Sequence, residues 1–363
     1  MRRNSRKAAF ADSLEVSSRL TGVRLSSKPS HAPCDTRDAF REMLLADGVL
    51  RNRDAILTPL AGGVSSEIYK VEDGAETFVV KRALAKLNVA DEWFADVSRN
   101  KHEVDYLRFV EGLVPGSTPS IRAVSVEHGY FTMEFLGVEF ANWKTLLLGG
   151  ELVNAHAHEA GRVLGIIHRE TWDNAAVRAE FETTANFRQL RTEPYLLTTG
   201  QRHPGHALLF IAEVERIESN RRCLVHGDYS PKNMLISGPR LVILDCEVAW
   251  FGDPAFDVAF LLNHFMLKAL YLSARRDAFF ALAQTAWTTY ARELGDARSA
   301  EVGRTAPRLL LMLMLARVDG KSPVEYLRDD ASKKAAIRQF ATRHLAAPPA
   351  TLPEFFTAWK ERL

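Results

Sequence analysis

Three oxygen-bearing side chains, Asp228, Asn233 and Asp245, lie close together in the sequence between apolar segments. Asp228 and Asn233 are five residues apart in a polar loop that contains Pro231, and Asp245 ends an apolar run twelve residues after Asn233. Asn and Asp oxygens are hard ligands that suit Mg²⁺. A further Asp beside the metal can orient a hydroxyl group and take its proton. Phosphoryl transfer requires this set of groups, because it depends mainly on positioning and charge stabilisation.

The order of these groups matches a known pattern. The segment His226-Gly-Asp-Tyr-Ser-Pro-Lys-Asn233, followed by Ile243-Leu-Asp245, resembles the phosphotransferase family of aminoglycoside and choline kinases. By motif order the resemblance covers residues 50–345. It implies an α+β class and a bilobal protein-kinase-like fold, with a small β-rich N-lobe and a larger, mostly helical C-lobe. It also implies that ATP and Mg²⁺ are the cofactors.

The resemblance implies a role for each residue of this segment. Asp228 corresponds to the catalytic base, and Asn233 and Asp245 to the ligands of Mg²⁺ ions that bridge the ATP phosphates. His226 is expected to support the loop rather than to take part in the chemistry. Asp257, which lies in an apolar stretch, corresponds to a residue that holds the catalytic-loop backbone.

Two neighbours of the expected metal site leave alternatives open. Glu247 follows Asp245 by two residues, so both side chains would point the same way on a continuing strand. This Asp-x-Glu pattern resembles methylthioribose kinase, a sugar kinase of the same superfamily, in which case Glu247 is a second metal ligand; otherwise it is a supporting or surface carboxylate. Lys232 either meets the γ-phosphate or is solvated.

The nucleotide-binding residues are expected before residue 137. Gly62 and Gly63 permit close backbone approach in a turn between two strands, and Ser65 and Ser66 offer donors to phosphate oxygens. A Gly-Gly turn is also a common structural element, so its position before Lys81 is what favours the nucleotide role.

Lys81 ends the apolar run Phe78-Val-Val-Lys81. In the kinase-like pattern such a lysine contacts the α- and β-phosphates and pairs with a helical Glu. Glu103 is the expected partner, because it shares a helical column with Leu107 and Val110. The alternative is a solvated pair of surface charges.

Residues Met133, Glu134 and Phe135 resemble the hinge where backbone groups bind adenine. The specificity of a hinge comes from its backbone N–H and C=O groups, so the alternative, that these side chains are plain strand residues, stays open.

Composition sets the class and the organisation. With 363 residues, 47% hydrophobic residues, a net charge of +2 and three cysteines without metal-ligand spacing, the chain is typical of a globular protein of about two domains. We expect cytoplasmic localisation, no membrane span and no nucleic-acid partner. The expected organisation is a mobile arm over 1–38, an N-lobe over 39–136, and a C-lobe with the acceptor pocket over 137–363.

Hydrophobic periodicity predicts the elements of these lobes. Strands are expected near 55–60, 68–72, 77–81, 121–127 and 130–135, helices over 36–50, 91–111, 153–168 and 206–219, a short β insert over 222–245, and helices from Pro254 onward with breaks near Gly295, Gly320 and Pro348.

The acceptor is a small molecule with a hydroxyl group, such as an aminoglycoside, an amino alcohol or a sugar. Residues 39–363 carry 39 basic and 41 acidic residues, a net −2, which does not favour a polycationic substrate. The loop after Arg317 is expected to be a helix-ending turn, with acceptor contact as the alternative. His264 and Lys268 are expected to be packing and surface residues.

Two other functions fit the same residues less well. A protein kinase would need an activation segment that the sequence after Asp245 leaves little room for. A catalytically silent, nucleotide-binding regulatory protein of the same fold would usually have lost the base or a metal ligand, and all three are present.

Overall fold

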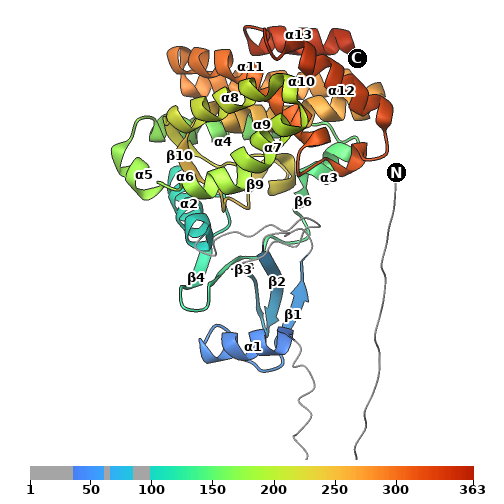
Figure 1. Ribbon diagram of the computed structural model, residues 1–363. Coiled ribbons are helices and arrows are strands. Elements are labelled where there is room, and N and C mark those ends of the chain that lie inside the picture. Colours follow the sequence, from blue (N-terminus) through green and yellow to red (C-terminus); the bar gives the residue numbers. More distant parts are fainter. Residues whose placement is uncertain (1–35, 61–65, 85–98) are drawn as a thin grey trace, which may run out of the picture.

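A computed structural model describes residues 36–60, 66–84 and 99–363. The chain divides into an N-terminal region built on a β-sheet and a larger region that is mostly helical, the α+β, kinase-like arrangement expected from the sequence (Figure 1). The strands of the first region lie below the helices in this view, and α1 lies at the far end of the sheet.

The N-terminal sheet has five antiparallel strands in the order β1-β2-β3-β5-β4. Gly74 makes the tight turn between β2 and β3 with a φ of 63°, a left-handed conformation that glycine adopts without strain. The elements of this region are α1 (Thr36–Ala46), β1 (Ile56–Pro59), β2 (Ser66–Asp73), β3 (Glu76–Ala83), α2 (Arg99–Leu113), β4 (Ile121–Ser125) and β5 (Tyr130–Glu134).

Two small sheets follow in the second region and hold the loops with the polar residues. One pairs β10 with β7, and the other has the order β6-β8-β9. Their bounds are β6 (Ala141–Asn142), β7 (Cys223–Val225), β8 (Met234–Ser237), β9 (Arg240–Ile243) and β10 (Trp250–Gly252).

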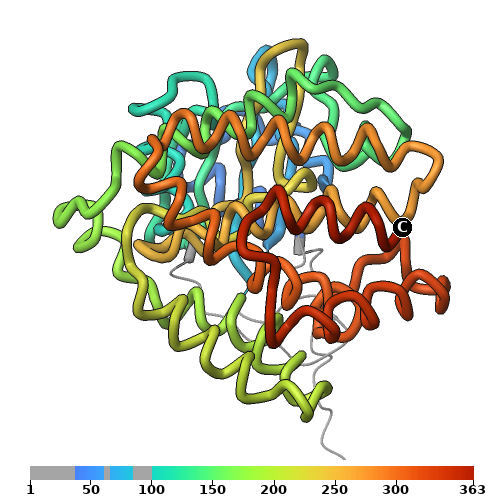
Figure 2. Tube along the Cα trace, turned by 90° about the horizontal axis from the view of Figure 1, so that it is seen from above, coloured from blue at the N-terminus to red at the C-terminus, as the bar shows by residue number. Residues whose placement is uncertain are grey.

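The helical region is built around α9, whose residues are buried from its first turn almost to its end. Asp253 caps α9 by accepting a hydrogen bond from the Ala255 N–H, and Pro254 occupies the first turn, as the sequence predicts. Seen from above, α13 (dark red) lies across the middle of this region (Figure 2). The Trp359 side chain of α13 donates to the Met266 carbonyl of α9 at 3.1 Å.

The helices of this region are α3 (Trp143–Leu148), α4 (Asn154–Thr171), α5 (Ala175–Glu180), α6 (Thr184–Phe187), a π-helical segment (Arg188–Leu197), α7 (Thr198–Arg202), α8 (Ala207–Ser219), α9 (Pro254–Tyr271), α10 (Arg276–Leu294), α11 (Asp296–Asp319), α12 (Ala331–His344) and α13 (Leu352–Arg362). Of these, α10 and α11 pack against α9. Short 3₁₀ turns cover Pro204–His206, Pro231–Asn233, Ser273–Arg275 and Glu325–Leu327.

Several local features differ from the sequence expectation. The helix expected over 36–50 ends at Ala46, and β6, α3, α5, α6 and α7 were not predicted. A break at Leu272 separates α9 from α10, β10 adds a strand after the expected β insert, and the π-helical segment has no counterpart in the predicted elements. The helix expected over 91–111 is seen from Arg99, and its earlier residues lie outside the described part of the chain.

Among the described helices, none is both long and apolar enough to cross a membrane alone; α9 and residues 273–294 reach that threshold only together, as a pair bent by 116°.

Candidate active site

The buried carboxylate of Asp257 fixes the backbone of the loop that follows β7. The backbone N–H groups of His226 and Gly227 donate to the two oxygens of Asp257 at 2.7 and 2.9 Å. Gly227 has a φ of 78°, and a Cβ there would come within 2.8 Å of the Val248 carbonyl oxygen. The loop therefore needs glycine at this position and a buried acceptor at position 257.

The His226 ring ties this loop to the segment that carries Asp245. Its Nε2 lies 3.1 Å from the Leu244 carbonyl, and its Nδ1 accepts from the Asp228 N–H at 3.1 Å. Burial lowers the pKa of His226, although neighbouring carboxylates oppose the shift. A neutral ring with its proton on Nε2 satisfies both contacts, so His226 fixes the geometry of the loop rather than pointing at a substrate.

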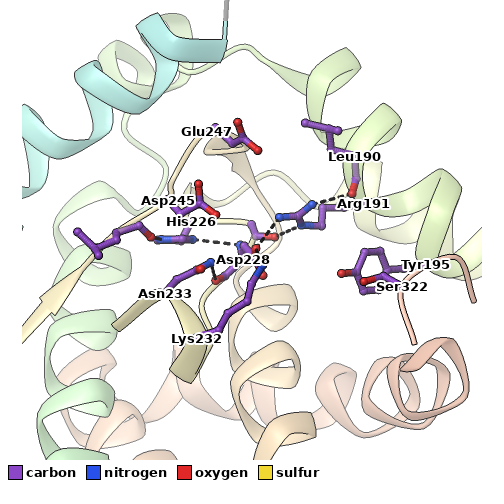
Figure 3. Close-up of polar contacts among 12 residues, drawn as sticks. Leu190, Arg191, Tyr195, His226, Asp228, Lys232, Asn233, Asp245, Glu247 and Ser322 are labelled. Carbon is purple, nitrogen blue, oxygen red and sulfur yellow. Dashed lines mark hydrogen bonds and ion pairs between the residues drawn. The ribbon is translucent and has the colours of Figure 1, made fainter. Parts of the chain in front are cut away.

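The two oxygens of Asp228 have different surroundings (Figure 3). Arg191 and Lys232 each form an ion pair with Oδ2 at 3.0 Å. Oδ1 is buried and has no hydrogen-bond partner among the described residues. Burial alone would raise the pKa of Asp228, but Lys232 and Arg191 outweigh burial and hold it below its usual value. Asp228 is thus a fixed, ionised carboxylate with one oxygen left to accept a hydrogen bond.

Arg191 is a site residue that the sequence reasoning missed. It lies in the π-helical segment, is almost fully buried, and donates from Nε to the Gly227 carbonyl at 2.5 Å as well as to Asp228. π-helical turns are rare in proteins, and those that do occur are often found at functional sites. The sequence offers no periodic signal for such a turn, and Pro194 within it argues against any regular helix there.

Lys81 joins the N-terminal sheet to the helical region. Its Nζ lies 2.8 Å from Glu103 Oε1 on α2 and 2.7 Å from Asp245 Oδ1. Burial alone would lower the pKa of Lys81, but Asp245 and Glu103 raise it above its usual value. Lys81 therefore stays charged, and the pair with Glu103 that the sequence predicts is present.

Asp245 does not lie on a strand, contrary to the expectation that it ends one. β9 ends at Ile243, and Asp245 has a φ of 61°, in the left-handed region that non-glycine residues seldom adopt. The argument that Asp245 and Glu247 point the same way along one strand is therefore wrong. In Figure 3 both lie above Asp228 in the view, on the side of it opposite to the Lys232 stem.

The expected metal ligands offer oxygen donors only. Asn233 uses its Nδ2 to donate to the Asp228 carbonyl at 3.0 Å, which leaves its Oδ1 for a cation. Asp245, Glu103 and the buried Glu247 act on Lys81, and Lys232 and Arg191 also act on Asp245, so three cations face the carboxylates of the site. The oxygen donors of Asn233, Asp245 and Glu247 are of the kind that suits Mg²⁺. Within the described residues, no group of three His, Cys, Asp or Glu side chains is arranged to hold a metal.

The remaining nucleotide candidates are only partly described. Ser66 begins β2 and is buried, with an Oγ that has no partner in the described part of the chain. Gly62, Gly63 and Ser65 lie outside the described residues.

The hinge candidates lie where the first sheet ends. Met133 and Glu134 close β5, and the Glu134 N–H donates to the Ser120 carbonyl at 2.9 Å. Phe135 follows, with Lys70 Nζ 5.0 Å from the centre of its ring. The chain then runs on to β6, so these residues connect the two regions.

Comparison with known proteins decides the family. A model of the phosphotransferase enzyme family matches residues 56–292, more than half of the chain. The chain belongs to this family. The match spans Lys81, Glu103 and the whole segment from His226 to Asp257. A search of curated proteins finds no match by sequence.

Solved structures show the same fold as this phosphotransferase. A choline/ethanolamine kinase family protein from Mesorhizobium loti is 14% identical with a TM-score of 0.51, covering 90% of this chain and 99% of that one. Amicoumacin kinase hAmiN, in complex with AMP-PNP, Ca²⁺ and Ami, is 15% identical with a TM-score of 0.53, covering 89% and 99%. Plasmodium vivax ethanolamine kinase is 12% identical with a TM-score of 0.50, covering 88% and 90%. The likeness of Asp245-Cys-Glu247 to methylthioribose kinase stays a prediction.

Proposed function

We propose that this phosphotransferase moves the γ-phosphate of ATP to a hydroxyl group of a small molecule in a Mg²⁺-dependent reaction. The observation that carries the proposal is the asymmetry of Asp228: two cations occupy Oδ2, while the buried Oδ1 has no partner in the described part of the chain. A buried carboxylate oxygen needs a donor. An acceptor hydroxyl is such a donor, and its oxygen would then lie in position to attack.

In the proposed reaction Asp228 orients the acceptor hydroxyl through Oδ1. The acceptor oxygen forms a bond to the γ-phosphorus, the bond from that phosphorus to the β,γ-bridging oxygen breaks, and ADP leaves. The hydroxyl proton passes to Asp228 and then to solvent. Because the pKa of Asp228 is held low, it is a weak base, which suits a loose transition state in which the proton leaves late.

In this proposal the other residues of the site position ATP and compensate the charge of its phosphates. Lys81 would contact the α- and β-phosphates, with Glu103 keeping its side chain in place. Asn233 and Asp245, with Glu247 as a further candidate, would hold Mg²⁺, which when bound supplies positive charge against the phosphate oxygens. Met133, Glu134 and Phe135 are proposed as the adenine hinge. Lys232 reaches Asp228 and is partly exposed, so it can also meet the γ-phosphate.

An ADP-release assay tests the proposal. Amino alcohols, sugars and aminoglycosides are offered with ATP and Mg²⁺ to wild type and to Asp228→Asn. We expect the variant to lose at least ~10²-fold in turnover, the lower range for a positioned acid–base group, while it keeps its affinity for ATP.

The matched control is Asp329→Asn, which changes an exposed Asp far along the chain. It should leave turnover unchanged. Unchanged turnover in Asp228→Asn would remove Asp228 from its proposed role. Nucleotide binding without transfer to any acceptor would favour the silent regulatory protein instead.

A further inference from the structure

A group of basic side chains extends from Asp228 through Tyr195 to α9 and the end of α11, and we call it the basic cluster. It comes from four separate parts of the chain: the π-helical segment, the catalytic loop, α9 and the end of α11. Its members are Arg191, Lys232, His264, Lys268 and Arg317. The expectation that Lys268 is a surface residue is wrong, because its side chain is fully buried; His264 and Arg317 are also buried.

The basic cluster is continuous with the catalytic loop. Arg191 binds Asp228, and its guanidinium lies 5.8 Å from the ring centre of Tyr195. Arg317 lies at the same distance from that ring and donates to the Tyr195 hydroxyl at 3.2 Å. In Figure 3 Tyr195 and Ser322 lie beyond Arg191, away from Asp245 and Glu247. Tyr195 thus lies between two arginines, one of which holds the catalytic carboxylate.

The Tyr195 ring also contacts α9. Tyr195 packs on Phe260 with ring centres 5.7 Å apart, and Phe260 packs on His264 at 5.6 Å. Phe260, His264 and Lys268 are spaced four residues apart on α9, so they share one face of that helix. Lys268 Nζ lies 5.2 Å from the ring centre of Tyr326.

Several polar atoms of the basic cluster lack a partner. Among the described residues, Lys268 Nζ, His264 Nε2 and Arg317 Nε are buried without a hydrogen-bond partner, and so is the Tyr326 hydroxyl beside Lys268. Native proteins rarely leave buried polar atoms unpaired. Lys268 Nζ and Arg317 Nε can only donate, so a ligand that satisfies them must supply acceptors.

Charge balance gives the sign of that ligand. Burial, together with the positive charges of Lys144 and Arg317, lowers the pKa of Lys268 to about 7, and only Glu325 opposes the shift. Glu325 is half-exposed and already pairs with Lys144 at 2.5 Å. Burial also lowers the pKa of His264 well below its usual value, and the positive charges of Lys268, Arg317 and Lys232 act in the same direction. No carboxylate of the described residues offsets Lys268 directly, and a buried unpaired cation is costly.

We infer that the acceptor of this phosphotransferase carries an anionic group, a carboxylate or a phosphate ester, which the basic cluster binds while Asp228 receives the hydroxyl. The inference rests on the proposed function and names its substrate class. Lys268 and Arg317 are the specificity-determining residues. Their charge disfavours polycationic aminoglycosides and quaternary ammonium alcohols, because like charges would be brought together in a water-poor place.

A matched set of three-carbon acceptors tests the inference. Glycerate carries a carboxylate, glycerol 3-phosphate a phosphate ester, glycerol no charge, and 2-amino-1,3-propanediol an ammonium group. Each is measured for thermal stabilisation of the protein with a non-hydrolysable ATP analogue and Mg²⁺, and for ADP release with ATP.

We expect at least one of the two anions to bind ~10-fold or more tightly than glycerol, the range of charge-assisted hydrogen bonds. The ammonium compound should bind more weakly than glycerol. The anion that binds better identifies the carboxylate or the phosphate ester. Equal or weaker binding of both anions relative to glycerol would overturn the inference.

The variant Lys268→Met separates a ligand-binding role from a structural one. Met fills a similar volume without charge, so we expect a higher melting temperature without ligand, because a buried unpaired cation is removed, together with loss of the preference for anions. Lys360→Met, at a half-exposed lysine that pairs with Asp277 on the molecule's surface, should change neither. A lower melting temperature with the anion preference intact would assign Lys268 to structure and overturn the inference.

The two proposals fail in different ways. Asp228-dependent ADP release with the ammonium compound or glycerol but not with anions would keep the phosphotransferase function and overturn the anionic acceptor. Lys268-dependent anion binding without ADP release from any acceptor would support the basic cluster as an anion site and count against phosphate transfer.

Discussion

Asp228 keeps its two carboxylate oxygens in different surroundings, and this division has a consequence for acid–base behaviour. Arg191 and Lys232 both contact Oδ2 and lower the pKa of the carboxyl group against the opposing effect of burial. In the proposed reaction the ionised carboxylate accepts a hydrogen bond from the hydroxyl of the acceptor molecule. We therefore expect each cation to extend activity toward lower pH.

Replacing one of these cations should move the pH profile. In Lys232→Met the pKa of Asp228 rises, because one of the two groups that lower it is gone. The acidic limb of kcat/KM, which reports groups of the free enzyme, should then shift to higher pH.

The measurement is the kcat/KM profile from mildly acidic to neutral pH, with Lys360→Met as the control. A loss of rate that is uniform over pH would show that Lys232 acts on the phosphate and not on the pKa of Asp228.

At the residue scale the sequence locates Asp228, Asn233 and Asp245 because they form a specific spaced pattern. It does not locate Arg191 or Lys268, because each is one basic residue in a stretch without a motif. Their roles arise from burial and from partners far away in the sequence. The left-handed backbone of Asp245 was likewise missed, since residue type alone argued for a strand.

At the scale of elements, the close packing of α4 against α10 supports the loop that carries Asp228. Gly161 on α4 is buried, and a Cβ there would overlap the Ala286 carbonyl oxygen of α10. The helix axes can approach closely only because no side chain intervenes. Tyr229, next to Asp228, also donates to the Ala160 carbonyl at 2.8 Å.

We predict that Gly161→Ala destabilises the protein by about 1–3 kcal/mol, the usual cost of overpacking a core. The cost should appear although alanine favours helix more than glycine does. Thermal and urea unfolding measure it.

The matched control is Gly112→Ala on α2, where a Cβ would have nothing within 4 Å. That variant should be neutral or more stable by up to about 1 kcal/mol. Equal effects of the two substitutions would contradict the close-contact explanation.

The order and approximate bounds of most elements follow from hydrophobic periodicity, because α4, α8 and the strands of the first sheet each bury one face. Periodicity does not reveal β10, a three-residue strand, or the π-helical segment. Such short or irregular elements are set by tertiary contacts, such as Arg191 with Gly227, rather than by a repeat in the sequence.

At the scale of the whole molecule, the candidate site draws on both regions. Lys81 comes from the first sheet and contacts Asp245 from the helical region at 2.7 Å. A nucleotide bound there would contact both regions at once, so binding should stabilise the molecule as a unit. The two-region division itself was predictable, because the change from strand-like to helical patterning near residue 137 is plain in the sequence.

We predict that ATP with Mg²⁺ raises the melting temperature of wild type, as expected for about 2.7 kcal/mol when ligand is at 100 times its Kd. Lys81→Met should lose most of this shift, because the cation facing the phosphates is gone. Asp228→Asn should keep it.

Differential scanning fluorimetry with and without nucleotide measures each shift against the same variant without ligand. A full ATP-induced shift in Lys81→Met would place the nucleotide elsewhere in the molecule.

The backbone at Asp245 is strained, yet the side chain opposes its replacement. A glycine there would relax the left-handed conformation, which costs other residues roughly 1–3 kcal/mol, but would delete a carboxylate that pairs with the buried Lys81. Since loss of one partner of a buried ion pair is strongly destabilising, an engineering campaign that scored only survival on heating should retain aspartate at this position.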